Sequence, residues 1–528
     1  MSRETASYRT MGSTAGSAPA ARSRIPPELE ALLAKGEGLV TLLRGPSGSG
    51  KTAIAAELAA RWPGPVIWAT TRTALSDKPV PEEAARFVRV DLSLTSSIRD
   101  GSTEDLFAAR DALLHWFEPG TSGDPRDSFP RGLAEVLPDH PTKPSTLLAI
   151  DSWDGLLDRY LDLTDPSGGN ALRPGRLERT LLSLLHAMGV SLLMVSERGG
   201  SDLSDPLADV VLVTAVAEFE ERLVRIFALP KVRGRPVTEP VYPYTLSEGR
   251  FTFVPRLSAE SQSLAIGAEP DPDPTDHSSV WPGSRAFVDA FGRLPVGELS
   301  LLELDPTVPP EASRLLTAGA ALPTLLGGGN LLLVVPPDVD LERMVEGFRA
   351  LAPDAELARR VRILSAREPP LVEAPLRPIF IAARDPGQRT TGFIAIRDEA
   401  SLLMQPVFPE TSRLLRASSS NGAANLAVVM LEGLESAGVA YGRPYAPETV
   451  AGLLRQDVIG APAHIVVISR SDDPLIPGLR GVANPYLRIL ERQGRVFIVG
   501  VRPWTPAFVL IPRADALEGP LYELLRMS

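Results

Sequence analysis

The chain has 528 residues, of which 44% are hydrophobic and 23% charged, and its formal net charge is −11. At roughly 100–200 residues per domain this length predicts about two to four domains, and the acidic balance argues against a general polyanion-binding surface. Cysteine is absent, which excludes disulfides, thiolate metal sites and a cysteine nucleophile. No apolar run approaches the roughly 18–20 residues of a membrane span, so we expect a cytoplasmic protein without a membrane segment.

The first 24 residues are rich in Ser, Ala, Thr and Arg and contain a single acid, Glu4. This composition predicts a disordered tail, although organelle transit peptides share it. A short helix that opens at Pro26 should then lead into the first strand of a domain that covers residues 25–257.

Apolar strands alternate with helical stretches from Leu39 to about Pro255. This alternation predicts a mostly parallel sheet with helices on both faces. We expect strands at residues 39–43, 66–69, 87–90, 146–150, 191–195, 210–214 and 223–228, and helices at residues 53–61, 103–117 and 176–188. No helix is expected between 223–228 and the last strand, 242–252, so these two predict an antiparallel extension.

The segment from Gly45 to Thr52 reads GPSGSGKT and fits the Walker A or P-loop pattern without a mismatch. An apolar strand precedes it and a helical run follows, so its backbone N–H groups and the helix N-terminus would hold the phosphates of ATP. Lys51 would reach the β- and γ-phosphates and the Thr52 hydroxyl would bind Mg²⁺. The nucleotide-binding candidates are Gly45, Pro46, Ser47, Gly48, Ser49, Gly50, Lys51 and Thr52.

Four further residues complete the candidate site. Asp151 ends a buried apolar strand, where its carboxylate would help to hold Mg²⁺. Ser196 ends the strand that begins at residue 191, and we expect it near the γ-phosphate. Lys231 and Arg233 alternate on a strand and therefore point to the same side; they are either catalytic cations that act on the phosphates or part of a solvated sheet edge.

Residues 258–284 are rich in Pro and Asp and predict an extended linker. Residues 285–528 again alternate between strands and helices and predict a second α/β domain, with strands at residues 299–304, 330–335, 361–364, 379–382, 424–431, 464–469 and 496–501. At the place where a phosphate loop would follow a strand of this domain, Val334 to Leu341 reads VVPPDVDL, with two acids and neither glycine nor lysine. Because no lysine follows Lys231, we expect this second domain to be degenerate and to lack a P-loop.

In chain order, GPSGSGKT, LLAIDSWDGLL, SLLMVSE, LADVVLV and RLVRIFALPKVRG resemble the KaiC/RadA branch of the RecA-like ATPases. VIWATTR and PVYPYTLSEGRF are closest to the archaeal GvpD-like proteins. The resemblance covers residues 25–256. It implies a RecA-like P-loop NTPase core, a homo-oligomeric ring or filament with ATP at subunit interfaces, and Lys231 and Arg233 that reach the ATP site of a neighbouring subunit. It also fits a second, degenerate RecA-like domain.

One departure from the family concerns hydrolysis. Its members carry a catalytic carboxylate directly after the second strand, whereas this chain reads Ala69-Thr-Thr-Arg72 there. Four acids stay open as the base: Asp77, Glu82, Glu83 and Asp154. The loop at 199–209 holds three acids and no basic residue, which opposes binding to DNA phosphates.

These patterns together predict an ATP-binding regulatory NTPase with slow Mg²⁺-dependent hydrolysis, which signals to a protein partner such as a transcription regulator. A DNA-dependent recombinase or repair ATPase and a nucleotide-binding scaffold with little turnover are the alternatives.

Overall fold

The computed structural model divides the chain into two compact units. Unit 1 contains Met1–Thr214, Phe227–Tyr242 and Gly249–Phe253, and unit 2 contains Ala215–Ile226, Pro243–Glu248 and Val254–Ser528. The residues that the structure describes are 25–35, 38–71, 87–91, 145–157, 182, 185, 189–197, 204–237, 239–247, 251–257, 269, 271–273, 276, 278–326, 329–335, 340–349, 353–365, 376, 380–382, 427–432, 463–474, 476–512 and 522–527. The predicted disordered tail lies outside them.

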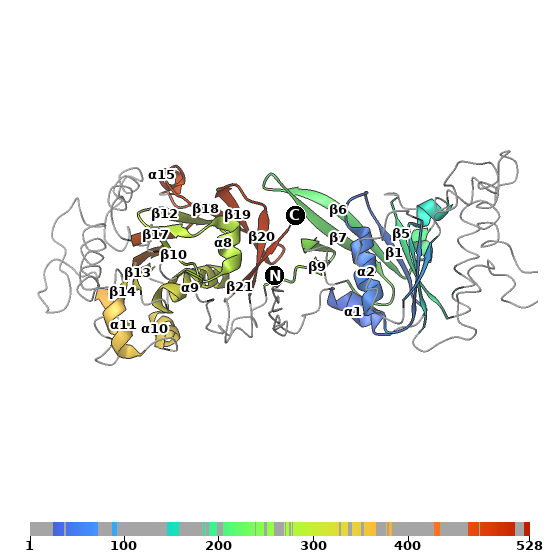
Figure 1. Cartoon of the computed structure of the whole chain (residues 1–528), viewed down its shortest axis with the longest axis horizontal. Coiled ribbons are helices and arrows are strands. Elements are labelled where there is room, and N and C mark those ends of the chain that lie inside the picture. The colour runs from blue at the N-terminus through green and yellow to red at the C-terminus, as the bar shows by residue number, and fades with distance from the viewer. Residues whose placement is uncertain are drawn as a thin grey trace, which may run out of the picture. The chain divides into compact units, whose positions relative to one another are not determined.

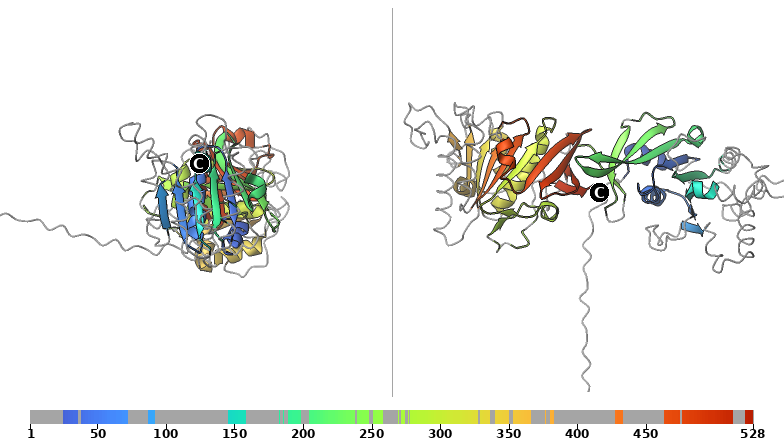
Figure 2. Two further views of the ribbon diagram at one scale, coloured as in Figure 1. Left: turned by 90° about the vertical axis from the view of Figure 1, so that its right-hand side faces the viewer. Right: turned by 90° about the horizontal axis from the view of Figure 1, so that it is seen from above.

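Unit 1 is built on a sheet with the order β3-β2-β4-β5-β1-β6-β7-β8-β9. Its strands are β1 (Val40–Arg44), β2 (Val66–Thr70), β3 (Phe87–Asp91), β4 (Leu147–Asp151), β5 (Ser191–Ser196), β6 (Val210–Phe219), β7 (Arg222–Val232), β8 (Val241–Thr245) and β9 (Thr252–Phe253). The blue, cyan and green strands lie side by side in Figure 2. The pairs among β1 to β6 are parallel. The central strands β2, β4 and β5 are buried along their whole length, as expected of a parallel sheet covered on both faces.

The helix that follows the phosphate-loop sequence is α2 (Lys51–Arg61), which packs on β1, β4 and β5. It lies alongside these strands in Figure 1. Ile54 and Leu58 are spaced one turn apart and are both buried, each contributing about 1.5–3 kcal/mol. The helix ends at Arg61, and the next residue, Trp62, is extended and precedes Pro63. The other helices of unit 1 are α1 (Pro27–Leu33) and α7 (Ser204–Leu207).

Unit 2 contains a ten-stranded sheet with the order β15-β14-β13-β16-β17-β12-β18-β19-β20-β21, and the two-stranded sheet β10-β11. The strands are β10 (Ser279–Val280), β11 (Leu294–Pro295), β12 (Leu299–Leu304), β13 (Asn330–Val335), β14 (Val361–Ser365), β15 (Phe380–Ala382), β16 (Ala427–Glu432), β17 (Ala463–Arg470), β18 (Tyr486–Arg492), β19 (Arg495–Arg502), β20 (Ala507–Pro512) and β21 (Tyr522–Arg526). The helices are α8 (Arg285–Phe291), α9 (Pro310–Leu326), α10 (Leu341–Arg349), α11 (Asp354–Arg360) and α15 (Ile476–Arg480).

The two large sheets share one strand order. With β15 set aside as an extra edge strand, the strands of unit 2 follow one another in the same spatial sequence as β3-β2-β4-β5-β1-β6-β7-β8-β9 of unit 1. In this correspondence β12 matches β1, β16 matches β4 and β17 matches β5. The parallel pairs β12–β17, β12–β18, β13–β16 and β16–β17 also match their counterparts. Both units are therefore α/β folds of the same topology.

This correspondence corrects the predicted position of the degenerate loop. The loop that corresponds to Gly45–Gly50 follows β12, not β13, so it is the segment from Asp305 to Pro309 between β12 and α9. Asp305 accepts hydrogen bonds from the Thr307 hydroxyl at 2.7 Å and from the Thr307 backbone N–H at 3.0 Å. These bonds lower the pKa of Asp305, so a carboxylate occupies a place where a phosphate loop offers positive charge.

The tip of the β6–β7 hairpin, Ala215–Ile226, belongs to unit 2, although the sequence predicted only short strands here. The buried Arg222 donates to the carbonyl oxygens of Thr505 and Gly500 at 2.7 and 2.6 Å. Its guanidinium also lies 5.0 Å from the centre of the Trp504 ring. The hairpin tip is thus fixed within unit 2 by hydrogen bonds and a cation–π contact.

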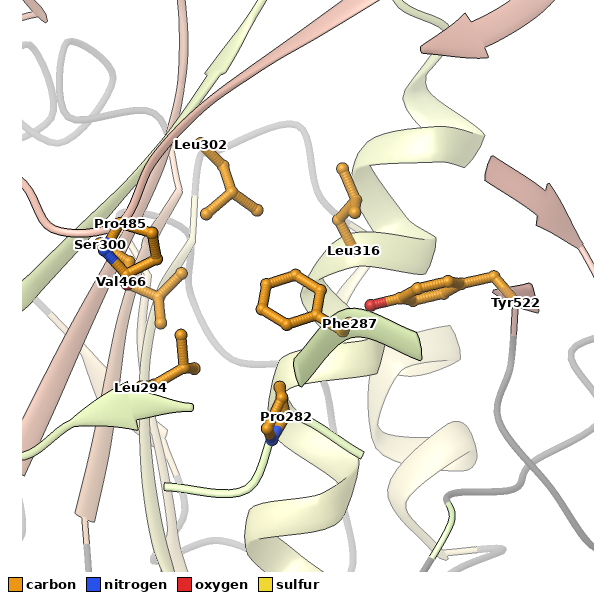
Figure 3. A pocket seen from close by; sticks show the side chains of 9 residues that line it. All are labelled: Pro282, Phe287, Leu294, Ser300, Leu302, Leu316, Val466, Pro485 and Tyr522. Carbon is orange, nitrogen blue, oxygen red and sulfur yellow. The ribbon is translucent and has the colours of Figure 1, made fainter. Parts of the chain in front are cut away.

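Unit 2 has its core between the sheet and helices α8 and α9. Phe287, Leu302 and Leu316 surround a small pocket of about 20 Å³ into which the Tyr522 ring points (Figure 3). This volume holds about one water molecule, so the pocket is too small for a nucleotide. Burial raises the pKa of the Tyr522 hydroxyl above its usual value.

Part of the predicted linker is held in place. Arg293 forms ion pairs with Asp271 at 2.8 Å and with Asp276 at 3.5 Å, and its guanidinium lies 5.5 Å from the centre of the Trp281 ring. Two acids of the predicted linker, Asp271 and Asp276, thus form ion pairs with one arginine. Within the described part of the chain, no helix is long and apolar enough to cross a membrane.

Candidate functional site

The loop Gly45–Thr52 joins β1 to α2, and three of its glycines have positive φ: 153° at Gly45, 79° at Gly48 and 89° at Gly50. Gly45 is also confined by a neighbour, whereas a Cβ at Gly48 would meet nothing within 4 Å. A Cβ at Gly45 would lie 2.1 Å from Thr214 Oγ1 and 2.4 Å from the Thr214 carbonyl oxygen. Strand β6 therefore approaches the start of the loop so closely that only glycine fits.

Ser49 stabilises the loop from within. Its hydroxyl is fully buried and donates to the Pro46 carbonyl oxygen at 2.8 Å, and it also lies 2.7 Å from Thr214 Oγ1. Thr214 in turn bonds to the Arg44 carbonyl oxygen at 3.2 Å. The side chain of Ser49, predicted as a nucleotide contact, thus links the loop to β6.

Lys51 brings a positive charge into the centre of the loop. It is buried, and its Nζ donates to the carbonyl oxygens of Gly45 and Pro46, both at 2.8 Å. An ammonium with three donors on a flexible stem is suited to bind phosphate oxygens as a point charge. The loop backbone therefore fixes this charge at the first turn of α2, where the helix dipole is also positive.

Thr52 and Asp151 meet at the same place. The Thr52 hydroxyl donates to Asp151 Oδ2 at 2.8 Å, and Asp151 is fully buried at the end of β4. Mg²⁺ prefers one or two protein oxygens, with nucleotide phosphates and water as its other ligands. Among the described residues no group of three or more His, Asp or Glu could hold a metal. The Thr52 hydroxyl and the Asp151 carboxylate are two oxygen donors of the kind that Mg²⁺ prefers.

Ser196 ends β5, the strand between β1 and β4. In the register of the sheet it pairs with Arg44, the residue directly before the loop. Its hydroxyl donates to both carboxylate oxygens of Asp154, at 3.1 and 3.0 Å. The Glu197 backbone N–H donates to the same carboxylate. Ser196 and Asp154 therefore form a buried pair on the edge of the sheet that carries the loop.

The end of β2 carries hydroxyl groups. Thr70 pairs with Asp151 in the sheet, and the Thr71 backbone N–H donates to the Asp151 carbonyl oxygen at 2.9 Å. The Thr71 hydroxyl accepts a hydrogen bond from the Ser152 N–H at 3.0 Å. The candidate bases outside the described residues are Asp77, Glu82 and Glu83.

Lys231 and Arg233 lie at the opposite end of the strands, beside the start of β1. Lys231 Nζ donates to the Pro206 carbonyl oxygen at 3.1 Å, and Arg233 pairs with Asp209 Oδ1 at 2.8 Å. Asp209 caps the start of β1 through the Val40 N–H at 3.0 Å. The loop begins where β1 ends, about 13 Å away at 3.3 Å per residue.

The structure therefore brings Lys51, Thr52, Asp151 and Ser196 together at the carboxyl ends of β1, β4 and β5. It leaves Lys231 and Arg233 near the amino end of β1. Sequence inspection missed Thr214, because its partner Ser49 is 165 residues away in the chain. Threonine in a strand has no local pattern that would indicate this contact.

Comparison of the chain with protein-family models and with curated proteins finds no match.

Proposed function

We propose that the chain is an ATP-binding regulatory NTPase of the KaiC/GvpD-like type, in which unit 1 is RecA-like. The observation that carries this proposal is the hydrogen bond between Thr52 and Asp151 beside Lys51. A P-loop hydroxyl, a strand-end carboxylate and a buried ammonium are the groups that bind a nucleoside triphosphate with Mg²⁺. When bound, Mg²⁺ neutralises charge on the phosphates.

Hydrolysis in this proposal is slow. The end of β2 presents Thr70 and Thr71, and Thr71 already accepts the Ser152 N–H. A hydroxyl at this position is a much weaker base than the carboxylate of the family, so activation of water is poor. The same observation supports the second candidate, a nucleotide-binding scaffold with little turnover.

Lys231 and Arg233 act on the nucleotide of a neighbouring subunit in this proposal. They lie a full strand length from the loop of their own chain, and 69% of the Arg233 side chain is exposed. When copies associate head to tail, an exposed arginine near the amino end of β1 can reach the carboxyl ends of the strands in another copy. Such head-to-tail association produces rings or filaments.

Unit 2 is, in this proposal, a degenerate RecA-like domain that signals to a protein partner. The repeated strand order supports the common ancestry of the two folds. The Asp305 loop carries negative charge, and no lysine occurs after Lys231. Such a loop repels phosphate, which leaves this unit for contacts with proteins.

The test measures ATP binding and turnover by the full chain and by Lys51→Ala, with Lys35→Ala as the matched control outside the loop. Lys51→Ala should abolish ATP binding while thermal unfolding shows that the chain stays folded, and Lys35→Ala should bind like wild type. Equal binding by Lys51→Ala and wild type would refute the proposal. Strong stimulation by single-stranded DNA would instead favour the recombinase alternative.

The neighbouring-subunit contact is tested by mixing two inactive variants. Arg233→Ala retains a complete loop, and Lys51→Ala retains its arginine, so a mixed assembly regains activity at those interfaces that combine the two. At equal amounts about a quarter of the interfaces of a cyclic assembly would be restored. No recovery at any ratio would contradict the contact.

A further inference from the structure

We propose that Asp154 is the proton acceptor for ATP hydrolysis and acts through the Ser196 hydroxyl, which positions the attacking water. This inference rests on the proposed function of the loop. It assigns a role to a carboxylate that lies three residues after Asp151. The family that the chain resembles carries its catalytic base after the second strand, where this chain has threonine.

The geometry of the pair supports this role. Both oxygens of Asp154 accept the Ser196 hydroxyl, at 3.1 and 3.0 Å, and the backbone N–H of Glu197 fixes the carboxylate from the end of β5. Asp154 is buried, with 9% of its surface exposed. Burial weakens competition from water, and the three contacts hold Asp154 in one orientation.

The position of the pair in the sheet places it beside the loop that would hold the phosphates. Strand β5 lies between β1, which leads into the loop, and β4, which ends at Asp151. Ser196 pairs with Arg44, so its Cα lies about 4.8 Å across the sheet from the residue before Gly45. Ser196 is therefore level with the start of the loop. Its strand lies between the strand that leads into the loop and the strand that ends at Asp151.

The protonation pattern of the pair determines its chemistry. Because Ser196 donates its proton to Asp154, its oxygen keeps lone pairs that accept a hydrogen bond from water. In the reaction the water oxygen bonds to the γ-phosphorus, and the bond from that phosphorus to the ADP oxygen breaks with its electron pair on ADP. The water proton passes to Ser196 Oγ while the Ser196 proton passes to Asp154, which later releases it to solvent. Atoms and charges balance without another reactant.

The test compares Asp154→Asn, Ser196→Ala and Ser196→Thr in the full chain, with Ser191→Ala as the matched control. Ser191 is a buried serine at the other end of β5, where its hydroxyl accepts the Leu39 N–H at 3.0 Å. We expect Asp154→Asn and Ser196→Ala to lower kcat about 100- to 1,000-fold and to leave the Kd for ATP within about twofold. Ser196→Thr should recover most of kcat because it restores the hydroxyl, and Ser191→Ala should keep the kcat of wild type.

The outcomes separate this inference from the proposed function. If wild type does not bind ATP, the proposed function itself fails. If wild type binds and hydrolyses ATP while Asp154→Asn keeps its kcat, only the proton acceptor is refuted. The same holds if Asp154→Asn weakens binding without changing kcat. If wild type binds ATP with no turnover, the proton acceptor is refuted and the nucleotide-binding scaffold replaces the slow NTPase. Ser196→Ala decides the question if Asp154→Asn fails to fold.

Discussion

Replacing Gly45 with alanine would test the close approach of β6 to the loop. The new Cβ would lie 2.4 Å from the Thr214 carbonyl oxygen. The Thr214 side chain can rotate away, but its carbonyl oxygen belongs to the backbone of β6 and cannot. Crowding of this kind costs about 1–3 kcal/mol, and the φ of 153° at Gly45 adds a similar amount for a residue with a side chain. We therefore expect Gly45→Ala to lower the free energy of unfolding by about 4 kcal/mol.

Gly48→Ala is the matched control, because Gly48 also has a positive φ, 79°, but a Cβ there would meet nothing within 4 Å. It should cost only the left-handed backbone term, about 1 kcal/mol. The difference of about 3 kcal/mol corresponds to a gap of roughly 6–12 °C in Tm for a unit of this size. Scanning calorimetry of both variants measures the gap. Equal unfolding temperatures would show that β6 does not approach the loop as described.

Three further predictions concern unit 2. Arg222→Ala should destabilise unit 2 by about 3 kcal/mol in urea unfolding, because carbonyl oxygens lose a buried charged donor, and an unchanged midpoint would contradict this. Burial lowers the pKa of His464 to about 4, below its value of about 6.5 in the unfolded chain. The unfolded chain therefore binds the extra proton first, and the free energy of unfolding falls by up to about 3 kcal/mol as the pH is lowered from 6.5 to 4. His464→Gln should abolish this part of the pH dependence. Glu303→Leu removes the buried carboxylate that accepts hydrogen bonds from Arg480 at 2.6 and 2.8 Å and from the Tyr486 hydroxyl. It should cost about 1–3 kcal/mol in urea unfolding, because the buried hydroxyl loses its acceptor while the Arg480 side chain is 44% exposed, and Tyr486→Phe in addition should recover most of the loss.

The candidate site was predictable from the sequence where its residues are contiguous. Gly45 to Thr52 form one loop because a strand, a turn and a helix follow each other in the chain, so local pattern and spatial site coincide. Asp151 was predictable because the carboxyl ends of buried parallel strands meet at one edge. The Ser49–Thr214 and Ser196–Asp154 contacts depend on strand order, which local pattern does not contain.

The fold was predictable where strands are apolar on both faces. The predicted bounds of β12 and β13 agree with the structure, because such strands appear as continuous apolar runs. Strand β18, with the sequence YLRILER, was missed because it mixes charged and apolar residues, as antiparallel strands do. The degenerate loop was placed after the wrong strand for a related reason: which strand matches β1 is decided by pairing between residues far apart in the chain.

The shared strand order of the two units has a stoichiometric consequence. Two sheets of one topology offer two strand-to-helix corners at which a phosphate could bind, yet only the corner after β1 has glycines and a lysine, while the corner after β12 carries Asp305. A calorimetric titration with ATP should therefore saturate at one nucleotide per chain. In the proposed assembly each chain would then contribute one fold that binds a nucleotide, unit 1, and one fold that does not, unit 2.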